Sequence, residues 1–369
     1  MNTKTWTTFL LTFFCHSLTA QLIDFQGPYP WPPNIPNSQI PSDAIANSDS
    51  RIIAWATQVT NYSPGSNVSA IWMNTSQALG AAEGAVDSIV SLGANGSITL
   101  SFATPITNGS GTDFVVFENS FDDFFLELAW VEVSSDGVHF SRFPASSQWN
   151  FPTSSFGQID PTYIDGFAGK YTRGYGVPFD LSDLPQNTNV NPNNISFVRI
   201  VDIFGNGSQL DSNGNGIYDP TPTTISGGFD LDGVGVINEL QEYTYAQWVT
   251  EQSFNTNQNG EQQDPDQDGS SNLLEYWFGS NPLSNTDRPN FSLTRINDTS
   301  FEVSYPTISN QSSLSLQVQL SNDLVIWTPI ENLPILSSST STLDVNRTLN
   351  IARYTTDQNS NFIQFILTN

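Results

Sequence analysis

Residues 128–137 read Leu128-Ala129-Trp130-Val131-Glu132-Val133-Ser134-Ser135-Asp136-Gly137, an apolar run closed by the turn signal Ser135-Asp136-Gly137. Similar short runs, bounded by turn residues, recur between Val86 and Asn238 and include residues 97–102, 113–117 and 197–202. Runs of this length and composition are typical of β-strands. Since no helical pattern separates them, residues 51–238 are predicted to form an antiparallel, jelly-roll-like β-sandwich.

The pattern changes on both sides of this segment. Residues 21–50 are rich in proline and are predicted to be an irregular lead-in. Tyr245, Trp248 and Val249 stand at helical spacing, which predicts an amphipathic helix at the start of a linker over residues 239–287. Strand patterns resume after Asp287, at residues 301–305, 314–320, 351–354 and 362–367, and predict an immunoglobulin-like β-sandwich over residues 288–369. The predicted fold class is therefore mainly β, with a short helical linker.

The charge balance excludes several classes of partner. Lys and Arg number 10 and Asp and Glu number 36, so the formal net charge is 10 − 36 = −26. Nucleic acids are bound through clustered Lys and Arg, so no nucleic-acid partner is expected. Anionic membrane surfaces are disfavoured for the same reason.

Residues 1–20 have the pattern of a secretory signal peptide. Lys4 gives a positive end, residues 9–14 an apolar centre, and Ala20 a small residue suited to cleavage before Gln21. The apolar stretch is shorter than the ~20 residues of a membrane-spanning helix. We therefore expect a secreted, extracellular or cell-surface protein that does not insert into a membrane after signal cleavage.

Removal of these residues narrows the possible chemistry. The single cysteine, Cys15, leaves with them, and His139 becomes the only histidine. Disulfides, structural zinc sites and thiol catalysis then lack their ligands or nucleophiles. A Ser-His-Asp triad would depend on His139, which the surrounding Ser and Gly residues place in a hairpin turn.

An acidic loop before the terminal sandwich carries the clearest motif. Residues 264–275 place Asp at positions 1, 3 and 5, Gly at 6, Asn at 9 and Glu at 12, which is the spacing of an EF-hand calcium loop. Ca²⁺ requires six to eight oxygen ligands, and this spacing supplies them from one turn. The predicted ligands are Asp264, Asp266, Asp268, Ser270 through its carbonyl, Asn272 and Glu275, followed by an exit helix over residues 273–278. The alternative is a solvated acidic turn.

A second loop repeats part of this spacing. Asp211, Asn213, Asn215 and Asp219 occupy positions 1, 3, 5 and 9, but Pro222 stands at position 12. A weaker Ca²⁺ site is predicted here because only two carboxylates are present. An Asn-Gly-rich turn between strands is the alternative.

Paired carboxylates allow a catalytic alternative. Glycosidases place two carboxyl groups ~5–9.5 Å apart. Glu118, Glu127, Asp230 and Asp232 are the candidates, and Asp230 and Asp232 are expected to project from one face of a strand. Carboxylate pairs also arise without catalysis in so acidic a chain.

Six segments together resemble a known family. Two of them are Asp113-Phe114-Val115-Val116-Phe117-Glu118-Asn119 and Gly227-Gly228-Phe229-Asp230-Leu231-Asp232, and the others are residues 90–100, 131–137, 159–170 and 174–181. In this order they resemble bacterial secreted proteins described as cell surface proteins, often with PEP-CTERM-type sorting tails. The resemblance covers residues 50–238 and implies a jelly-roll-like sandwich and surface display, without an activity to transfer.

The remaining segment resembles another exported bacterial arrangement. Residues 266–276 are similar to its calcium-loop linker, and Ser321-Asn322-Asp323-Leu324-Val325-Ile326-Trp327 is similar to an element of its terminal β-sandwich. The chain ends without a sorting tail, so we expect release or non-covalent association with the surface.

The expected function is a calcium-stabilised binding or adhesion protein without catalytic activity. Ca²⁺ is the expected cofactor, and an extracellular glycan or a surface protein is the expected partner. The alternative is an extracellular carbohydrate-active hydrolase that uses the paired carboxylates.

Overall fold

The computed structural model describes residues 23, 25–35, 40–186, 189–255, 257–308, 315–330, 333, 335–344, 347–355 and 362–368. The predicted signal peptide lies outside these residues. The chain divides into two compact units, Met1–Glu239 and Leu240–Asn369, each described here by itself.

The first unit consists of strands joined by loops and four short 3₁₀ helices. Its strands are β1 (Ile45–Ala46), β2 (Ala54–Trp55), β3 (Gln58–Ser63), β4 (Val90–Ser91), β5 (Ser97–Ile106), β6 (Phe114–Glu118), β7 (Ala129–Ser134), β8 (Ser141–Arg142), β9 (Ser146–Ser147), β10 (Ile164–Asp165), β11 (Tyr175–Phe179), β12 (Ile195–Asp202), β13 (Asn206–Leu210), β14 (Gly216–Tyr218) and β15 (Asp230–Val236). The 3₁₀ helices are η1 (Ala70–Trp72), η2 (Thr75–Ala78), η3 (Pro161–Tyr163) and η4 (Leu181–Asp183).

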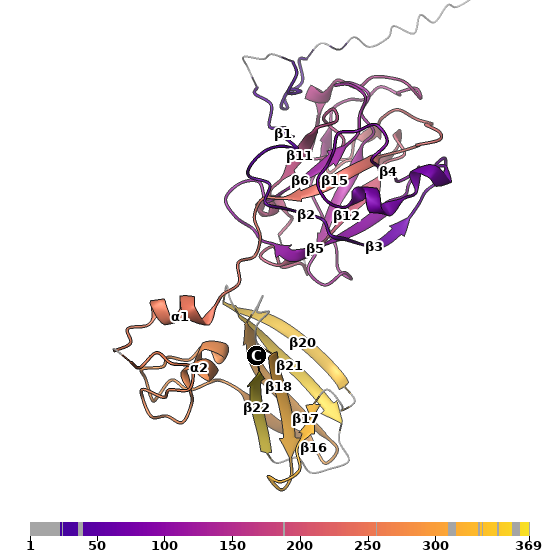
Figure 1. The fold of residues 1–369 in the computed structure, drawn as a ribbon. Helices are drawn as coiled ribbons and strands as arrows, with labels where there is room; N and C mark the ends of the chain where they lie inside the picture. Colours follow the sequence, from indigo (N-terminus) through magenta and orange to yellow (C-terminus); the bar gives the residue numbers. More distant parts are fainter. Residues whose placement is uncertain are drawn as a thin grey trace, which may run out of the picture. The chain divides into compact units, whose positions relative to one another are not determined.

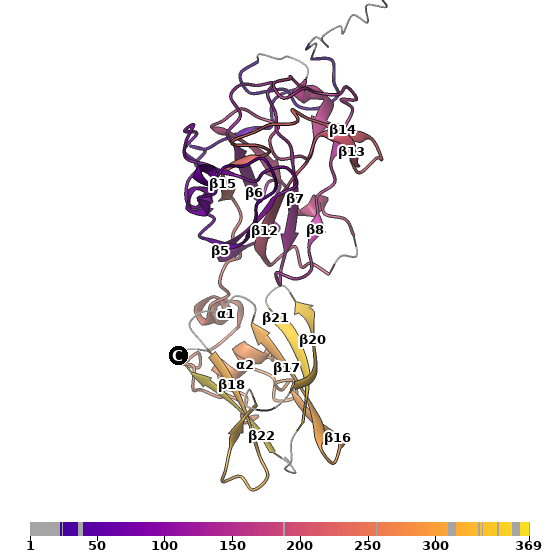
Figure 2. The same cartoon turned by 90° about the vertical axis from the view of Figure 1, so that its right-hand side faces the viewer.

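Two antiparallel sheets form the body of this unit. One has the order β1-β11-β6-β15-β2, with β4 also paired to β15 (Figure 1), and the other has the order β3-β5-β12-β7-β8 (Figure 2). The strands nearest the N-terminus form the two edges of the first sheet, since β1 pairs with β11 and β2 pairs with the end of β15. Two short hairpins, β9-β10 and β13-β14, lie outside these sheets.

The core fills the space between the two sheets. Side chains of β12 alternate after a register shift next to Ile195, so that Val198 and Ile200 are fully buried in the central apolar cluster. On the other face of β12, the Arg199 Nε donates to Glu132 Oε2 on β7 at 2.6 Å. This alternation of apolar and polar residues is the period-two pattern expected of a strand with one buried face.

Among its described residues, the second unit has two short α-helices and seven strands. They are α1 (Tyr245–Glu251), α2 (Asn272–Phe278), β16 (Ser292–Asn297), β17 (Ser300–Ile308), β18 (Ser315–Ser321), β19 (Thr328–Pro329), β20 (Ile335–Asp344), β21 (Arg347–Thr355) and β22 (Phe362–Thr368). The two sheets have the orders β16-β17-β21-β20 and β19-β18-β22. The first order corresponds to the A-B-E-D sheet of an immunoglobulin domain, and β18 and β22 take the places of strands C and F.

Both helices belong to the second unit. Thr244 caps α1 in a capping box with Gln247, and Gly279 ends α2 in the left-handed conformation, with φ of 83°. Trp248 of α1 and three aromatic residues of α2 are buried in one cluster with Ile308, and Phe365 packs against it from β22. The loop between the helices is therefore attached to the terminal sandwich.

The mainly β fold expected from the sequence is confirmed, with antiparallel sheets in both units. Four predicted strands agree with observed ones. Residues 97–102, 197–202 and 301–305 lie inside β5, β12 and β17, and residues 113–117 differ from β6 by one residue at each end. The predicted exit helix over residues 273–278 is α2. Neither described helix has the length and apolar character needed to cross a bilayer.

The core of the first unit provides a stability test. Ile200→Ala removes a side chain that is 0% exposed in the central strand, and we expect it to lower the free energy of unfolding by about 2–5 kcal/mol. Val138→Ala, at a position that is 75% exposed, should change it by about 0.5 kcal/mol or less. Urea denaturation of both variants measures the difference, and equal effects would contradict the placement of β12.

Candidate calcium site

The loop before α2 is folded by hydrogen bonds from its own backbone. The Gly269 amide donates to Asp264 Oδ2 at 2.9 Å, the Asp268 amide to Asp266 Oδ1 at 3.1 Å, and the Ser270 amide to Asp268 Oδ1 at 2.7 Å. Gly269 has φ of 96°, a conformation that favours glycine, as the sharp turn at position 6 requires. These bonds turn successive side chains towards the inside of the loop.

Three carboxylates meet inside this loop. One ligand atom each from Asp264, Asp266 and Asp268 lies within 4.8 Å of the others, and no other acidic or histidine group among the described residues meets this criterion. Asp266 Oδ2 and Asp268 Oδ2 are buried without a hydrogen-bond partner. The Arg288 Nε lies 3.7 Å from Asp268 Oδ2, but its side chain is 66% exposed, so it neutralises the group weakly.

Glu275 on α2 completes the acidic group. Its side chain is fully buried, Oε1 accepts a hydrogen bond from Ser280 Oγ at 3.2 Å, and Oε2 has no partner. Burial, followed by repulsion from Asp266, raises the pKa of Glu275 to about 7. An oxygen that is buried, acidic and unpartnered is costly unless a cation or a proton occupies its vicinity.

The other two predicted ligands have different positions. Asn272, at position 9, donates from Nδ2 to the carbonyl oxygens of Gln258 and Gly260 at 2.8 and 2.9 Å, and its buried Oδ1 has no partner. It therefore ties the preceding loop to the start of α2. Ser270 donates its amide to Asp268, which leaves the serine carbonyl as the group that could bind an ion.

Together these residues form an oxygen-lined site at one end of a helix. The donor set is carboxylate, amide and carbonyl oxygen without sulfur or imidazole, which suits a hard cation. Three clustered carboxylates with Glu275 nearby exceed what Mg²⁺ commonly takes from protein, whereas Ca²⁺ accepts irregular shells of six to eight oxygens. The arrangement can hold Ca²⁺.

The second predicted loop is arranged differently. Asp211 Oδ1 accepts the amides of Asn213 and Asn215, each at 2.8 Å, and Oδ2 accepts the Ser147 amide at 2.8 Å. Burial opposes the charge, but these hydrogen bonds together lower the pKa of Asp211. Asp219, the predicted fourth ligand, lies beyond β14 and accepts the Leu128 amide at 3.0 Å. The structure therefore does not bring Asp211 and Asp219 to one point.

Three of the four carboxylates considered for catalysis lie near one another inside the first unit. Burial, then repulsion by Asp230, raises the pKa of both Glu118 and Glu127. Asp232 has other partners, because its carboxylate accepts the amides of Glu83 and Gly84 at 3.1 and 2.8 Å. A register shift in β15 between Leu231 and Gly233 interrupts the alternation that would place Asp230 and Asp232 on one face.

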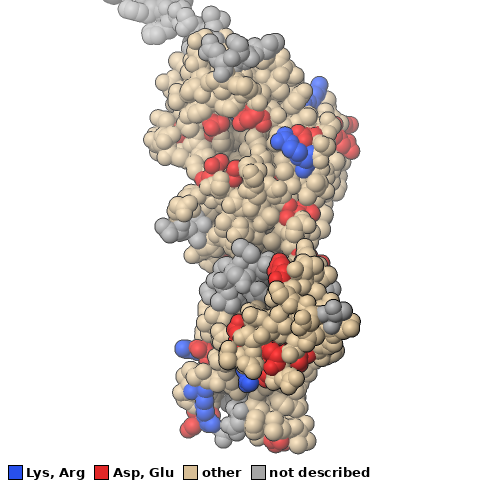
Figure 3. Space-filling view, turned by 90° about the vertical axis from the view of Figure 1, so that its left-hand side faces the viewer, with Lys and Arg blue, Asp and Glu red and all other residues tan. Residues whose placement is uncertain are grey.

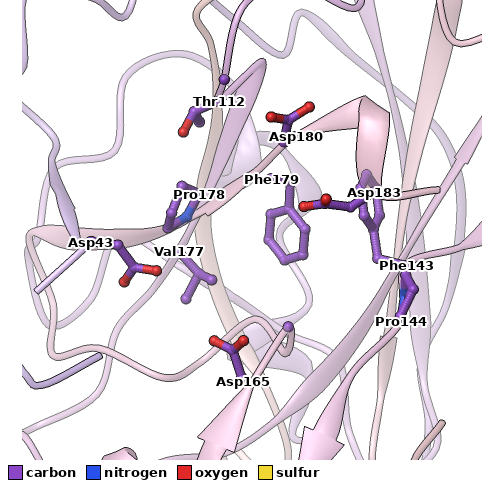
Figure 4. A pocket seen from close by; sticks show the side chains of 12 residues that line it. Asp43, Thr112, Phe143, Pro144, Asp165, Val177, Pro178, Phe179, Asp180 and Asp183 are labelled. Carbon is purple, nitrogen blue, oxygen red and sulfur yellow. The ribbon is translucent and has the colours of Figure 1, made fainter. Parts of the chain in front are cut away.

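One pocket was not anticipated from the sequence. It has a volume of about 530 Å³ and lies in the first unit (Figure 4). Four carboxylates border it, those of Asp43, Asp165, Asp180 and Asp183, and the ring of Phe179 lies among them. The four acids come from three segments, since Asp180 and Asp183 both belong to the turn at η4, and no single local motif includes all of them. Acidic side chains are also prominent on the face of the molecule shown in Figure 3, where basic ones are few.

No protein-family model matches this chain, and no curated protein matches it significantly. The resemblance to bacterial cell surface proteins stays an inference from the segments quoted above.

The raised pKa of Glu275 predicts a pH dependence in the absence of metal. The folded pKa of about 7 exceeds the ordinary 4.5, so the folded state binds this proton more tightly than the unfolded state. The corresponding stability is present below pH 4.5 and is lost as the pH rises to about 7. In a solution that contains a metal chelator, the second unit should therefore melt at a lower temperature at pH 8 than at pH 5.

Glu275→Gln removes this titrating group and should bring the melting temperatures of the second unit at pH 5 and pH 8 closer together. Calorimetry of both proteins in the chelator measures it. An equal pH dependence in wild type and variant would contradict the role given to Glu275.

Proposed function

We propose that this protein is a calcium-stabilised binding protein of the cell exterior, without catalytic activity. The observation that carries the proposal is the set of buried, unpartnered carboxylate oxygens on Asp266, Asp268 and Glu275. Bound Ca²⁺ would replace their mutual repulsion by coordination. The signal-peptide pattern of residues 1–20 supports the extracellular location, where free Ca²⁺ suits the weak sites of extracellular modules.

The ion would act on the architecture of the second unit. Asp264, Asp266 and Asp268 belong to the loop, whereas Glu275 belongs to α2, whose aromatic residues pack on the terminal sandwich. Coordination by all four therefore fixes the loop to the sandwich. The role of Ca²⁺ in this proposal is structural.

The pocket bordered by four Asp residues supports a glycan as the ligand. Carboxylates accept hydrogen bonds from sugar hydroxyls, and the ring of Phe179 offers an apolar surface beside them (Figure 4). Asp165 is held by the buried Lys170 at 3.3 Å, and the Asp180 carboxylate by the Ser182 amide at 2.8 Å. Acceptors fixed in this way lose little freedom when a ligand binds.

One observation favours the hydrolytic alternative. Glu127 lines a pocket of about 290 Å³ whose walls include Phe121, Phe125 and Phe156. Neighbouring rings stack with centroids 5.1 and 6.4 Å apart, and a carboxyl with raised pKa beside aromatic rings suits a general acid. Against it, Glu118, Glu127 and Asp230 are 8% exposed or less, which limits access to a polysaccharide.

The calcium proposal predicts a stability change in the second unit. For a Kd of ~10⁻⁴–10⁻³ M, ~10 mM Ca²⁺ should add roughly 1.4–2.7 kcal/mol. Glu275→Gln should abolish most of this gain, because the closing bidentate ligand is lost. Asp287→Asn removes one exposed charge from the same unit and should retain the gain. Calorimetry with and without Ca²⁺ measures it, and an identical response in all three proteins would refute the site.

A glycan array and a set of chromogenic polysaccharides separate binding from hydrolysis. Binding without turnover is expected, and Asp183→Asn should weaken it at least about tenfold if it removes a charge-assisted hydrogen bond of about 1.5–3 kcal/mol. Asp87→Asn, an exposed acid outside the pocket, should leave it unchanged. Turnover that Glu127→Gln abolishes would instead establish the hydrolase.

A further inference from the structure

The pocket lined by Glu127 is walled by the rings of Phe121, Phe125 and Phe156, and we call it the aromatic pocket. It lies in the first unit, has a volume of about 290 Å³ and shares no lining residue with the pocket of Figure 4. Its five other lining residues are serine, threonine or proline, and none is Lys or Arg. The aromatic pocket therefore offers a ligand aromatic rings, hydroxyl groups and one carboxyl group.

The rings of this pocket are open to solvent. Phe156 is 86% exposed and Phe121 is 59% exposed. The ring centroid of Phe125 lies 5.1 Å from that of Phe121 and 6.4 Å from that of Phe156, so the three rings lie side by side. No Lys or Arg in the part of the chain that the structure describes lies over any of them. A group of exposed apolar side chains, unlike a single one, indicates a binding surface.

Glu127 supplies negative charge to the aromatic pocket. It is 5% exposed, and its Oε1 accepts a hydrogen bond from Thr223 Oγ1 at 2.8 Å. Burial, followed by repulsion from Asp230 and Glu118, raises the pKa of Glu127. Within the described ranges, no Lys or Arg forms an ion pair with any of these three acids. Because a buried negative charge without a cation is unfavourable, a cation bound beside Glu127 would lower this cost.

Glu132 on β7 shows the same combination of carboxylate and aromatic rings with cations in place. Its Oε1 pairs with Arg142 at 2.7 Å, and its Oε2 accepts a hydrogen bond from Arg199 Nε at 2.6 Å. The Arg142 guanidinium lies 4.6 Å from the ring centroid of Trp130. The Arg199 guanidinium lies 3.7 Å from that of Phe140. Each cation is thus held by a carboxylate and a ring together. The aromatic pocket has the carboxyl group and the rings, but its lining residues include no cation.

We propose that the aromatic pocket binds a small organic cation that carries an alkylated ammonium group, as choline does. The alkyl groups of such a cation pack against the phenylalanine rings, while its charge is attracted by the rings and by Glu127. Rings and carboxylate both favour the cation over a neutral molecule of the same shape. This binding site is separate from the pocket of Figure 4, so it goes beyond the function proposed above. It gives Glu127 a role in binding and requires no acid catalysis.

The lining of the pocket also decides which kind of cation fits. A metal ion needs several oxygen ligands close together, whereas this pocket places one carboxyl group beside three apolar rings. A phosphate group attached to the cation would be repelled by a protein whose net charge is −26. We therefore expect the free cation as the ligand, in preference to the phosphate-linked headgroup of a lipid.

Isothermal titration of the intact protein with three probes tests the proposal. Choline should bind at least about tenfold more tightly than its uncharged analogue, in which a carbon atom replaces the nitrogen. Phosphocholine, which adds an anion to the same cation, should bind more weakly than choline. Equal binding of choline and the uncharged analogue, absence of choline binding, or tighter binding of phosphocholine would each overturn the proposal.

Two substitutions locate the binding in the aromatic pocket. Glu127→Gln removes the negative charge and should reduce the preference for choline over the uncharged analogue at least about threefold. Phe156→Leu keeps an apolar side chain but removes a ring, and should weaken choline binding about two- to fivefold. Because Phe156 is 86% exposed, this variant tests the pocket even if Glu127→Gln does not fold. Phe151→Leu, at an exposed position outside the pocket, should leave choline binding unchanged. Unchanged choline binding in Phe156→Leu, or equal weakening in Phe151→Leu, would refute the site.

Discussion

A shortage of basic side chains is the constraint on which the rest of this structure depends. With 36 acidic and 10 basic residues, acids far outnumber their possible ion-pair partners, and several carboxylates of the described residues are held by backbone amides instead. Asp113 is fully buried and accepts the amides of Gly109 and Leu181, both at 2.7 Å, and the side-chain amide of Asn238 at 2.8 Å. One carboxylate thereby ties together the segments before β6, after β11 and after β15. Such bonds need loops of defined shape, which explains why short strands and long ordered connections coexist in the first unit.

Backbone amides cannot satisfy every acid, and the two exceptions differ in kind. In the loop of residues 264–275 the acids are close in sequence, and a single turn gathers them before the chain enters α2. Five further buried acids, those of Glu118, Glu127, Asp202, Asp219 and Asp230, come from separate segments of the first unit, so only the completed sandwich brings them together. The arrangement of the first set therefore depends on local sequence, whereas that of the second set depends on the whole fold.

Local sequence patterns predicted what depends on neighbouring residues. The alternation in residues 197–202 predicted β12, and the spacing of Tyr245, Trp248 and Val249 predicted α1. The loop spacing likewise predicted that Asp264, Asp266 and Asp268 lie together. Contacts between distant segments had no such signal. Asp202 was seen only as a strand residue, although its carboxylate accepts the amides of Asn95 and Phe229 from two other segments. The four acids of the pocket in Figure 4 were missed for the same reason. A register shift in β15 between Leu231 and Gly233 also interrupts the alternation from which Asp230 and Asp232 were predicted to share one face.

The pairing of β2 with β15 has a consequence for the order of folding. Trp55 lies opposite Gly235, and Ala54 opposite Val236, about 180 residues apart in the chain. Contacts between such distant residues make folding slow, because a long loop must close before they form. A chain delivered with its N-terminus first leaves β2 without its partner until almost the entire first unit has followed. Completion of the sheet that contains β6 and β11 therefore requires both the start and the end of the unit.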